Sequence, residues 1–147
     1  MILDKELLFS DAQAVTATAV STNIVDLGPV AAGQLDRDIG QGEPLRLVVI
    51  CDTTALSTGS STVTVSIETD DAATFPSATV LYQSAAIAKA SITAGARLID
   101  IPLPKGFETF MRLRYTVAVA DLTAGAVTAM IVLDSQDNKS YKAAYTA

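Results

Sequence analysis

The sequence has no histidine, no tryptophan and a single cysteine, Cys51, and these absences exclude several kinds of site. Without histidine the chain cannot form a Ser-His-Asp or Cys-His catalytic arrangement, nor a histidine-ligated metal site. A lone cysteine has no partner in the chain for a disulfide, so nothing marks an oxidising compartment. Cys51 ends an apolar run that begins at Leu45, and we expect it to be a small buried side chain.

Positive charge is scarce, and long apolar runs are missing. Ten lysines and arginines stand against sixteen aspartates and glutamates, which gives a formal net charge of −6. This balance argues against nucleic acid or an anionic membrane as a partner. The chain has no stretch of about 18 apolar residues that could span a membrane. Its start, MILDKELLFSDAQ, lacks the features of a signal peptide. The sequence therefore predicts a protein made in a cytosol that binds neither nucleic acid nor membrane.

Short apolar and β-branched stretches make up most of the chain. Residues 62–69 alternate strictly, with Val63, Val65 and Ile67 on one side and hydroxyl or acidic side chains on the other. Such alternation is typical of a strand with one buried face. The nearly continuous apolar run at 45–51 predicts a strand that is covered on both faces. Further strands are predicted at 13–21, 23–27, 34–39, 79–84, 97–103, 109–120 and 126–134.

Turn signals at short spacing separate these segments, which amount to about eight strands. Residues 52–61 are interpreted as a polar turn region, and the alanine-rich residues 85–96 leave a short helix open. The pattern predicts an all-β fold, either a two-sheet β-sandwich or a barrel.

The chain is expected to form one domain with two extensions. Residues 1–12 are predicted to be an N-terminal arm, residues 13–134 the β-sandwich, and residues 135–147 a polar C-terminal tail. The apolar residues of the arm would be costly to leave in water but useful against a partner. The candidate contacts in the arm are Leu3, Leu7, Leu8 and Phe9. Deletion of residues 1–9 is therefore expected to leave the fold intact and to weaken assembly.

The acidic residues show no pattern typical of a catalytic or metal-binding site. The densest acid cluster, Glu68, Asp70 and Asp71, is interpreted as a set of solvated turn residues rather than a catalytic carboxylate pair. Asp36 and Asp38 faintly resemble the start of a calcium loop, but the residues that follow break the pattern, so a polar β-turn is favoured. No catalytic, cofactor-binding or metal-binding residue is predicted.

Two arginines are of more interest. Arg112 and Arg114 lie two apart in the longest predicted strand, so both point away from the face that Met111, Leu113 and Tyr115 share. They are either solvated or locally paired, or they form a contact with another chain, because two aligned guanidinium groups can bind a partner's carboxylates. In the second case, replacing both would lower partner affinity more than stability.

Three stretches of the chain share their pattern with one known family: MILDKELLFSDAQAVT at the start, IETDDAATFPSATVLYQS from Ile67 to Ser84, and IPLPKGFETFMRLRYTVAVADLTAGAVTAMIVLD from Ile101 to Asp134. Together they resemble the capsid cement, or head-decoration, proteins of tailed bacteriophages. The stretches keep their order and spacing over nearly half of the chain, and none is a catalytic fingerprint. One departure is Ala120-Asp121, where many relatives have glycine in the turn.

This resemblance implies a jelly-roll-like β-sandwich of about eight strands with an extended N-terminal arm. It implies a structural protein, not an enzyme, that needs no cofactor and forms a homo-oligomer, with a dimer favoured and a trimer possible. The implied partner is the major capsid protein, whose neighbouring subunits are bridged and stabilised. The implied location is the outer capsid surface of the virion, after synthesis in the host bacterial cytoplasm.

Two other functions stay open. A carbohydrate-binding β-sandwich usually exposes aromatic side chains for stacking, whereas this chain has four tyrosines and four phenylalanines and places Tyr115 on a predicted core face. A small hydrolase is disfavoured by the missing histidine. Catalytic turnover that is lost when Glu68 or Asp70 is replaced would support this alternative.

Overall fold

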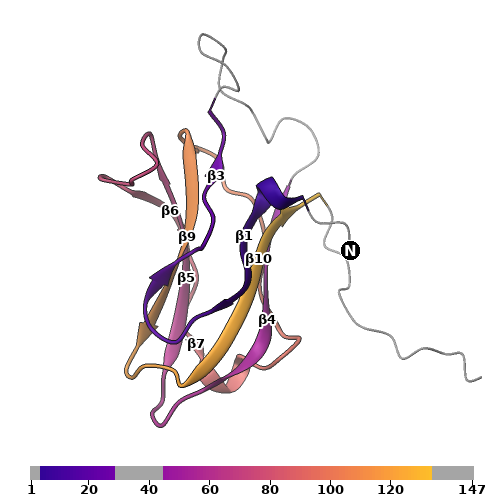
Figure 1. Cartoon of the computed structure of the whole chain (residues 1–147), viewed down its shortest axis with the longest axis vertical. Helices are drawn as coiled ribbons and strands as arrows, with labels where there is room; N and C mark the ends of the chain where they lie inside the picture. Colours follow the sequence, from indigo (N-terminus) through magenta and orange to yellow (C-terminus); the bar gives the residue numbers. More distant parts are fainter. Residues whose placement is uncertain (1–3, 29–44, 134–147) are drawn as a thin grey trace, which may run out of the picture.

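Two antiparallel sheets lie face to face in the computed structural model, which describes residues 4–28 and 45–133 (Figure 1). The four-stranded sheet contains β1 (Leu8–Ala14), β4 (Arg46–Leu56), β8 (Arg97–Pro102) and β10 (Ala124–Val132). The six-stranded sheet contains β2 (Ala19–Val20), β3 (Val25–Asp26), β5 (Thr62–Asp70), β6 (Thr79–Gln83), β7 (Ile87–Ala88) and β9 (Phe110–Ala118). The all-β, two-sheet prediction is therefore confirmed.

The strand order fits a jelly roll. The first sheet has the order β1-β10-β4-β8 and the second β2-β9-β5-β6, while β3 also pairs with β9 and β7 also pairs with β5. Because β2 and β3 share one position in their sheet, and β6 and β7 share another, the ten described strands fill eight positions. Eight positions in two layers are the arrangement of a jelly roll. Figure 1 shows β1, β10 and β4 on one side of the sandwich and β9, β5 and β6 on the other.

Helical structure among the described residues is limited to two 3-10 turns, η1 (Lys5–Leu7) and η2 (Lys89–Ser91). The alanine-rich segment considered for a helix forms β7 and η2 instead. Alanine favours a helix locally, but Ile87 and Ala88 pair with β5 in the sheet, and this tertiary pairing overrides the local preference.

Several strand ends differ from the sequence-based prediction. β4 continues to Leu56 because the residues after Cys51 still pair with β10, so the polar turn predicted from residue 52 is wrong there. β9 ends at Ala118, before the predicted end of this strand at residue 120, and Val119 has φ +77° and an exposed side chain. The strand predicted at 13–21 is split between the end of β1 and the short β2. The strand predicted at 34–39 lies outside the described residues.

The core fills the space between the sheets. β4 is buried on both faces, as predicted: Leu47 and Val49 face the core, while Val48 packs with Leu8 and Met130 in a second apolar cluster. Cys51 is a free thiol in the core, which confirms its expected place. Its pKa is raised by burial and by the neighbouring charge of Asp52, and the backbone hydrogen bond to Thr53 only partly offsets the shift.

The N-terminal segment is not an arm from Leu8 onward. It forms β1, which pairs with β10 through Leu8 opposite Met130 and Ser10 opposite Ala129. Phe9 is 0% exposed in the core, and Leu7 in η1 packs partly buried against it. The predicted arm is wrong here because the strand covers an edge of β10 and Phe9 fills space between the sheets. Leu3 and the predicted tail at 135–147 lie outside the described residues.

A hydrogen bond inside the core joins the two sheets. Ser10 Oγ of β1 lies 2.8 Å from the hydroxyl of Tyr115 in β9, and both residues are fully buried. Because Ser10 donates its own proton to Gln13 Oε1 over 2.7 Å, Tyr115 is the donor in the first bond. Burial raises the pKa of Tyr115 far above its ordinary value, so the hydroxyl stays protonated at neutral pH.

Replacing Tyr115 by phenylalanine is expected to lower the free energy of unfolding by about 1–2 kcal/mol, because one buried hydrogen bond is lost. Urea unfolding of the variant measures this loss. The Ser10→Ala variant and the double variant complete the cycle, and the double variant should lose less than the sum of the two single losses. Strictly additive losses would contradict an energetic link between Ser10 and Tyr115.

Candidate partner interface

Three charged side chains meet on the outer face of the six-stranded sheet, and we call Glu68, Arg112 and Arg114 the arginine cluster. In the paired strands β5 and β9, Glu68 lies directly opposite Arg112, and Arg114 lies opposite Ser66. Arg112 donates from Nε to Glu68 Oε2 over 2.7 Å. Arg114 donates from Nε to Oε1 and from Nη2 to Oε2, the latter over 3.3 Å. The structure thus brings the two predicted arginines together on one carboxylate.

The members of the cluster differ in exposure. The side chain of Glu68 is 5% exposed, that of Arg112 is 14% exposed and that of Arg114 is 37% exposed. Burial on its own raises the pKa of Glu68, but the hydrogen bonds and charges of Arg114 and Arg112 outweigh it and hold the pKa below its ordinary value. The hydrogen bond with Glu68 in turn raises the pKa of Arg114. At neutral pH the cluster therefore holds two cations and one anion.

The acidic residues of this segment are only in part the solvated turn residues that the sequence suggested. Glu68 and Asp70 are both buried, and only Asp71 is exposed. Asp70 does hold a turn, because its carboxylate accepts the backbone N–H groups of Ala72 over 3.0 Å and Ser77 over 2.8 Å. The error arose because side chains from β9 and from the loop after β5 cover this part of the outer face.

Phe75 in that loop covers Arg112. The guanidinium carbon of Arg112 lies 4.2 Å from the centre of the Phe75 ring, within the range of a cation–π contact. Phe75 has φ +51°, a left-handed conformation that is uncommon for a bulky residue, and its N–H is bonded to the carbonyl of Ala72. The loop thus holds Arg112 in place and leaves Arg114 as the accessible cation.

Apolar side chains lie on both sides of the cluster. Val20 in β2 is paired with Arg114 and is 37% exposed, and Val80 in β6 is paired with Glu68 and is 50% exposed. The adjacent positions Thr64 and Thr116 are small and uncharged. An arginine cluster with exposed apolar residues at its two sides resembles the composition of protein–protein interfaces.

The other predicted contact residues do not join this surface. Leu7, Leu8 and Phe9 belong to η1 and β1, on the side of the four-stranded sheet. Phe9 is enclosed in the core and cannot reach a partner, and Leu8 is buried in the second apolar cluster. Leu3 lies outside the described residues. The structure therefore separates the predicted arm residues from the two arginines.

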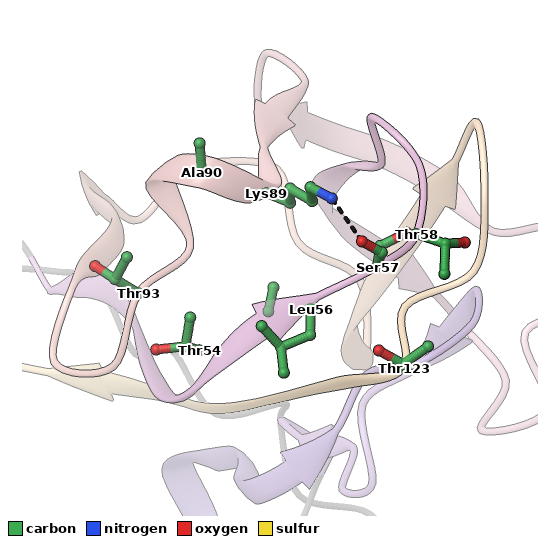
Figure 2. Close-up of a pocket in the computed structure, with 9 residues that line it drawn as sticks. Thr54, Leu56, Ser57, Thr58, Lys89, Ala90, Thr93 and Thr123 are labelled. Atoms are coloured by element: carbon green, nitrogen blue, oxygen red, sulfur yellow. Dashed lines mark hydrogen bonds between the residues drawn. The ribbon is translucent and has the colours of Figure 1, made fainter.

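A groove of about 320 Å³ lies between the end of β4 and η2 (Figure 2). The backbone N–H of Ala55 donates to the carbonyl of Ile92 over 2.9 Å and brings these segments together, a long-range contact that no local pattern in the sequence indicates. Lys89 points across the groove and donates from Nζ to the carbonyl of Ser57 over 2.6 Å. The groove is lined by Thr54, Ala55, Leu56, Ser57, Thr58, Lys89, Ala90, Thr93 and Thr123. This lining contains no aromatic side chain on which a sugar ring could stack, so the groove gives no support to the carbohydrate-binding alternative.

Within residues 4–28 and 45–133, no group of three or more Cys, Asp or Glu side chains is placed to hold a metal ion. The two acidic positions considered for a calcium loop, Asp36 and Asp38, lie outside these ranges. In the same part of the chain, no helix has the length and apolar character needed to cross a membrane.

A comparison with protein families finds a match to the family described as Bbp16 over residues 9–131. The match runs from β1 into β10 and contains the arginine cluster. It therefore extends over the whole sandwich rather than a short motif. No curated protein matches the chain.

Proposed function

The chain belongs to the Bbp16 family, and we propose from this premise that it is a structural protein of a bacteriophage head. In this role it binds the outer capsid surface and bridges neighbouring subunits of the major capsid protein. The family name suggests a phage-related protein, and the three sequence stretches similar to capsid cement proteins support the more specific role. The proposal includes a homo-oligomer on the virion surface, with a dimer favoured over a trimer.

The observation that best supports this role is a rigid sheet face that carries a fixed arginine. β5 and β9 pair along their full length, from Thr62 opposite Ala118 to Asp70 opposite Phe110, without a shift in register. Such a face can rest on another protein without rearranging, and many copies on one shell would turn a weak contact into a firm one. The net charge of −6 would also keep the protein away from packaged DNA.

Co-sedimentation with matching phage heads stripped of accessory proteins tests this function. We expect saturable binding at a fixed ratio of protein to capsid subunit, because each site on a symmetric shell is equivalent. Decorated heads should also survive heating that opens bare heads. Fully decorated heads serve as the control and should take up no more protein. Binding that never saturates, or that leaves the heat resistance of the heads unchanged, would contradict the proposal.

A further inference from the structure

We propose that Arg114, held by Glu68 and with Val20 beside it in the sheet, is the centre of a docking surface for a carboxylate-bearing segment of the capsid subunit. The identity of the partner rests on the proposed function. The chemistry of the partner rests on the charge, the rigidity and the surroundings of Arg114 itself.

The charge of the arginine cluster favours an acidic partner. Both carboxylate oxygens of Glu68 already accept hydrogen bonds, Oε2 from Arg112 and Oε1 from Arg114. One carboxylate cannot neutralise two guanidinium groups, so a positive charge remains and is exposed at Arg114. This charge stands on a protein with a net charge of −6. A partner carboxylate would complete the pairing, whereas a cationic partner would be repelled.

Arg114 is held in position before any partner arrives. Its Nε and Nη2 are bonded to Glu68, and its Nη1 has no hydrogen-bond partner among the described residues. A side chain that is already ordered loses little conformational freedom on binding, so more of the interaction energy appears as affinity. The planar guanidinium group can present its remaining N–H donors to a carboxylate.

The surroundings of Arg114 allow close contact. Val20 and Val80 provide exposed apolar surface on either side of the cluster, and Thr116 and Ala118 further along β9 are exposed and small. A charged anchor with an exposed apolar neighbour has the composition of an interface hot spot. The occupant is therefore an acidic segment that also carries apolar side chains.

Arg112 acts as a positioning residue in this surface. It is mostly buried beneath Phe75, and it fixes the orientation of Glu68, which in turn holds Arg114. Replacing both arginines would disturb the fold and the surface together. The single replacement of Arg114 separates the two effects.

The test compares head binding by the wild type, Arg114→Ala, Arg114→Lys and Arg97→Ala. Arg97 lies in β8 of the other sheet, so Arg97→Ala removes the same charge from a different face. We expect Arg114→Ala to bind heads at least about tenfold more weakly. Arg114→Lys should bind with intermediate affinity, because it keeps the charge and loses the planar fork. Arg97→Ala should bind like the wild type, and thermal unfolding should show that all variants are folded.

The outcomes separate the docking surface from the function. If the wild type binds heads and Arg114→Ala binds equally well, the docking surface is wrong while the proposed function stands. An equal loss in Arg97→Ala would show a general charge effect and would also overturn the surface. Loss of self-association in Arg114→Ala, with unchanged head binding, would assign the surface to a second copy of the chain. A wild type that does not bind heads overturns both proposals.

Discussion

Replacing Phe9 by alanine is expected to lower the free energy of unfolding by about 3–5 kcal/mol. Phe9 is 0% exposed and belongs to the core between the two sheets, so its removal leaves a cavity that the paired strands cannot easily close. A loss of this size is a large share of the stability of a typical domain, about 5–15 kcal/mol. Urea unfolding followed by circular dichroism measures it.

The neighbouring Leu7→Ala variant is the control for Phe9→Ala. Leu7 is only partly buried in η1, so we expect a loss of about 1 kcal/mol. Deletion of residues 1–9 should destabilise the fold at least as much as Phe9→Ala, in contrast to the expectation from the sequence. A deletion product with wild-type stability would contradict the structure and would support the interpretation of residues 1–9 as part of an arm.

Replacing Glu68 by glutamine is expected to lower the free energy of unfolding by about 2 kcal/mol at neutral pH, because two arginines lose their shared carboxylate. The loss should be smaller than for a fully enclosed ion pair, since the side chain of Arg114 is 37% exposed and water can solvate it. Urea unfolding of both proteins at neutral pH gives this difference directly.

The effect of Glu68→Gln should also depend on pH. The pKa of Glu68 is held below its ordinary value of 4.5, so its ionised form stabilises the fold above that value. This contribution is lost as the pH falls through the lowered pKa of the folded state, and the two proteins should converge once the pH lies below that lowered pKa. The exposed Asp71 provides the control, because Asp71→Asn also removes a negative charge from this segment but leaves Glu68 in place. A difference between wild type and Glu68→Gln that stays constant with pH would contradict the ionised cluster.

The parts of the fold that the sequence predicted are those with a local pattern. The alternation of Val63, Val65 and Ile67 gave both the strand and its buried face, because side chains of a strand alternate strictly. The nearly continuous apolar run at the start of β4 indicated burial on both faces, because neighbouring side chains of a strand point to opposite faces. β1 was missed because its place depends on pairing with β10, more than a hundred residues away along the chain, which no local pattern records.

The candidate site was predicted in part. Strand periodicity placed Arg112 and Arg114 on one outward face, and the structure agrees. Their pairing with Glu68 was missed, because it depends on the register between β5 and β9, which no tight hairpin fixes. The contact of Phe75 with Arg112 was also missed. It depends on the left-handed backbone conformation of Phe75 in the loop after β5, which no sequence pattern indicates.

Electron cryo-microscopy of matching heads incubated with the protein tests the proposed function most directly. A bridging role predicts added density on the outer capsid surface that contacts two neighbouring subunits, with the arginine cluster toward the shell. Heads that show no added density at a saturating protein concentration would contradict the bridging role. Added density that contacts only one subunit would also contradict it.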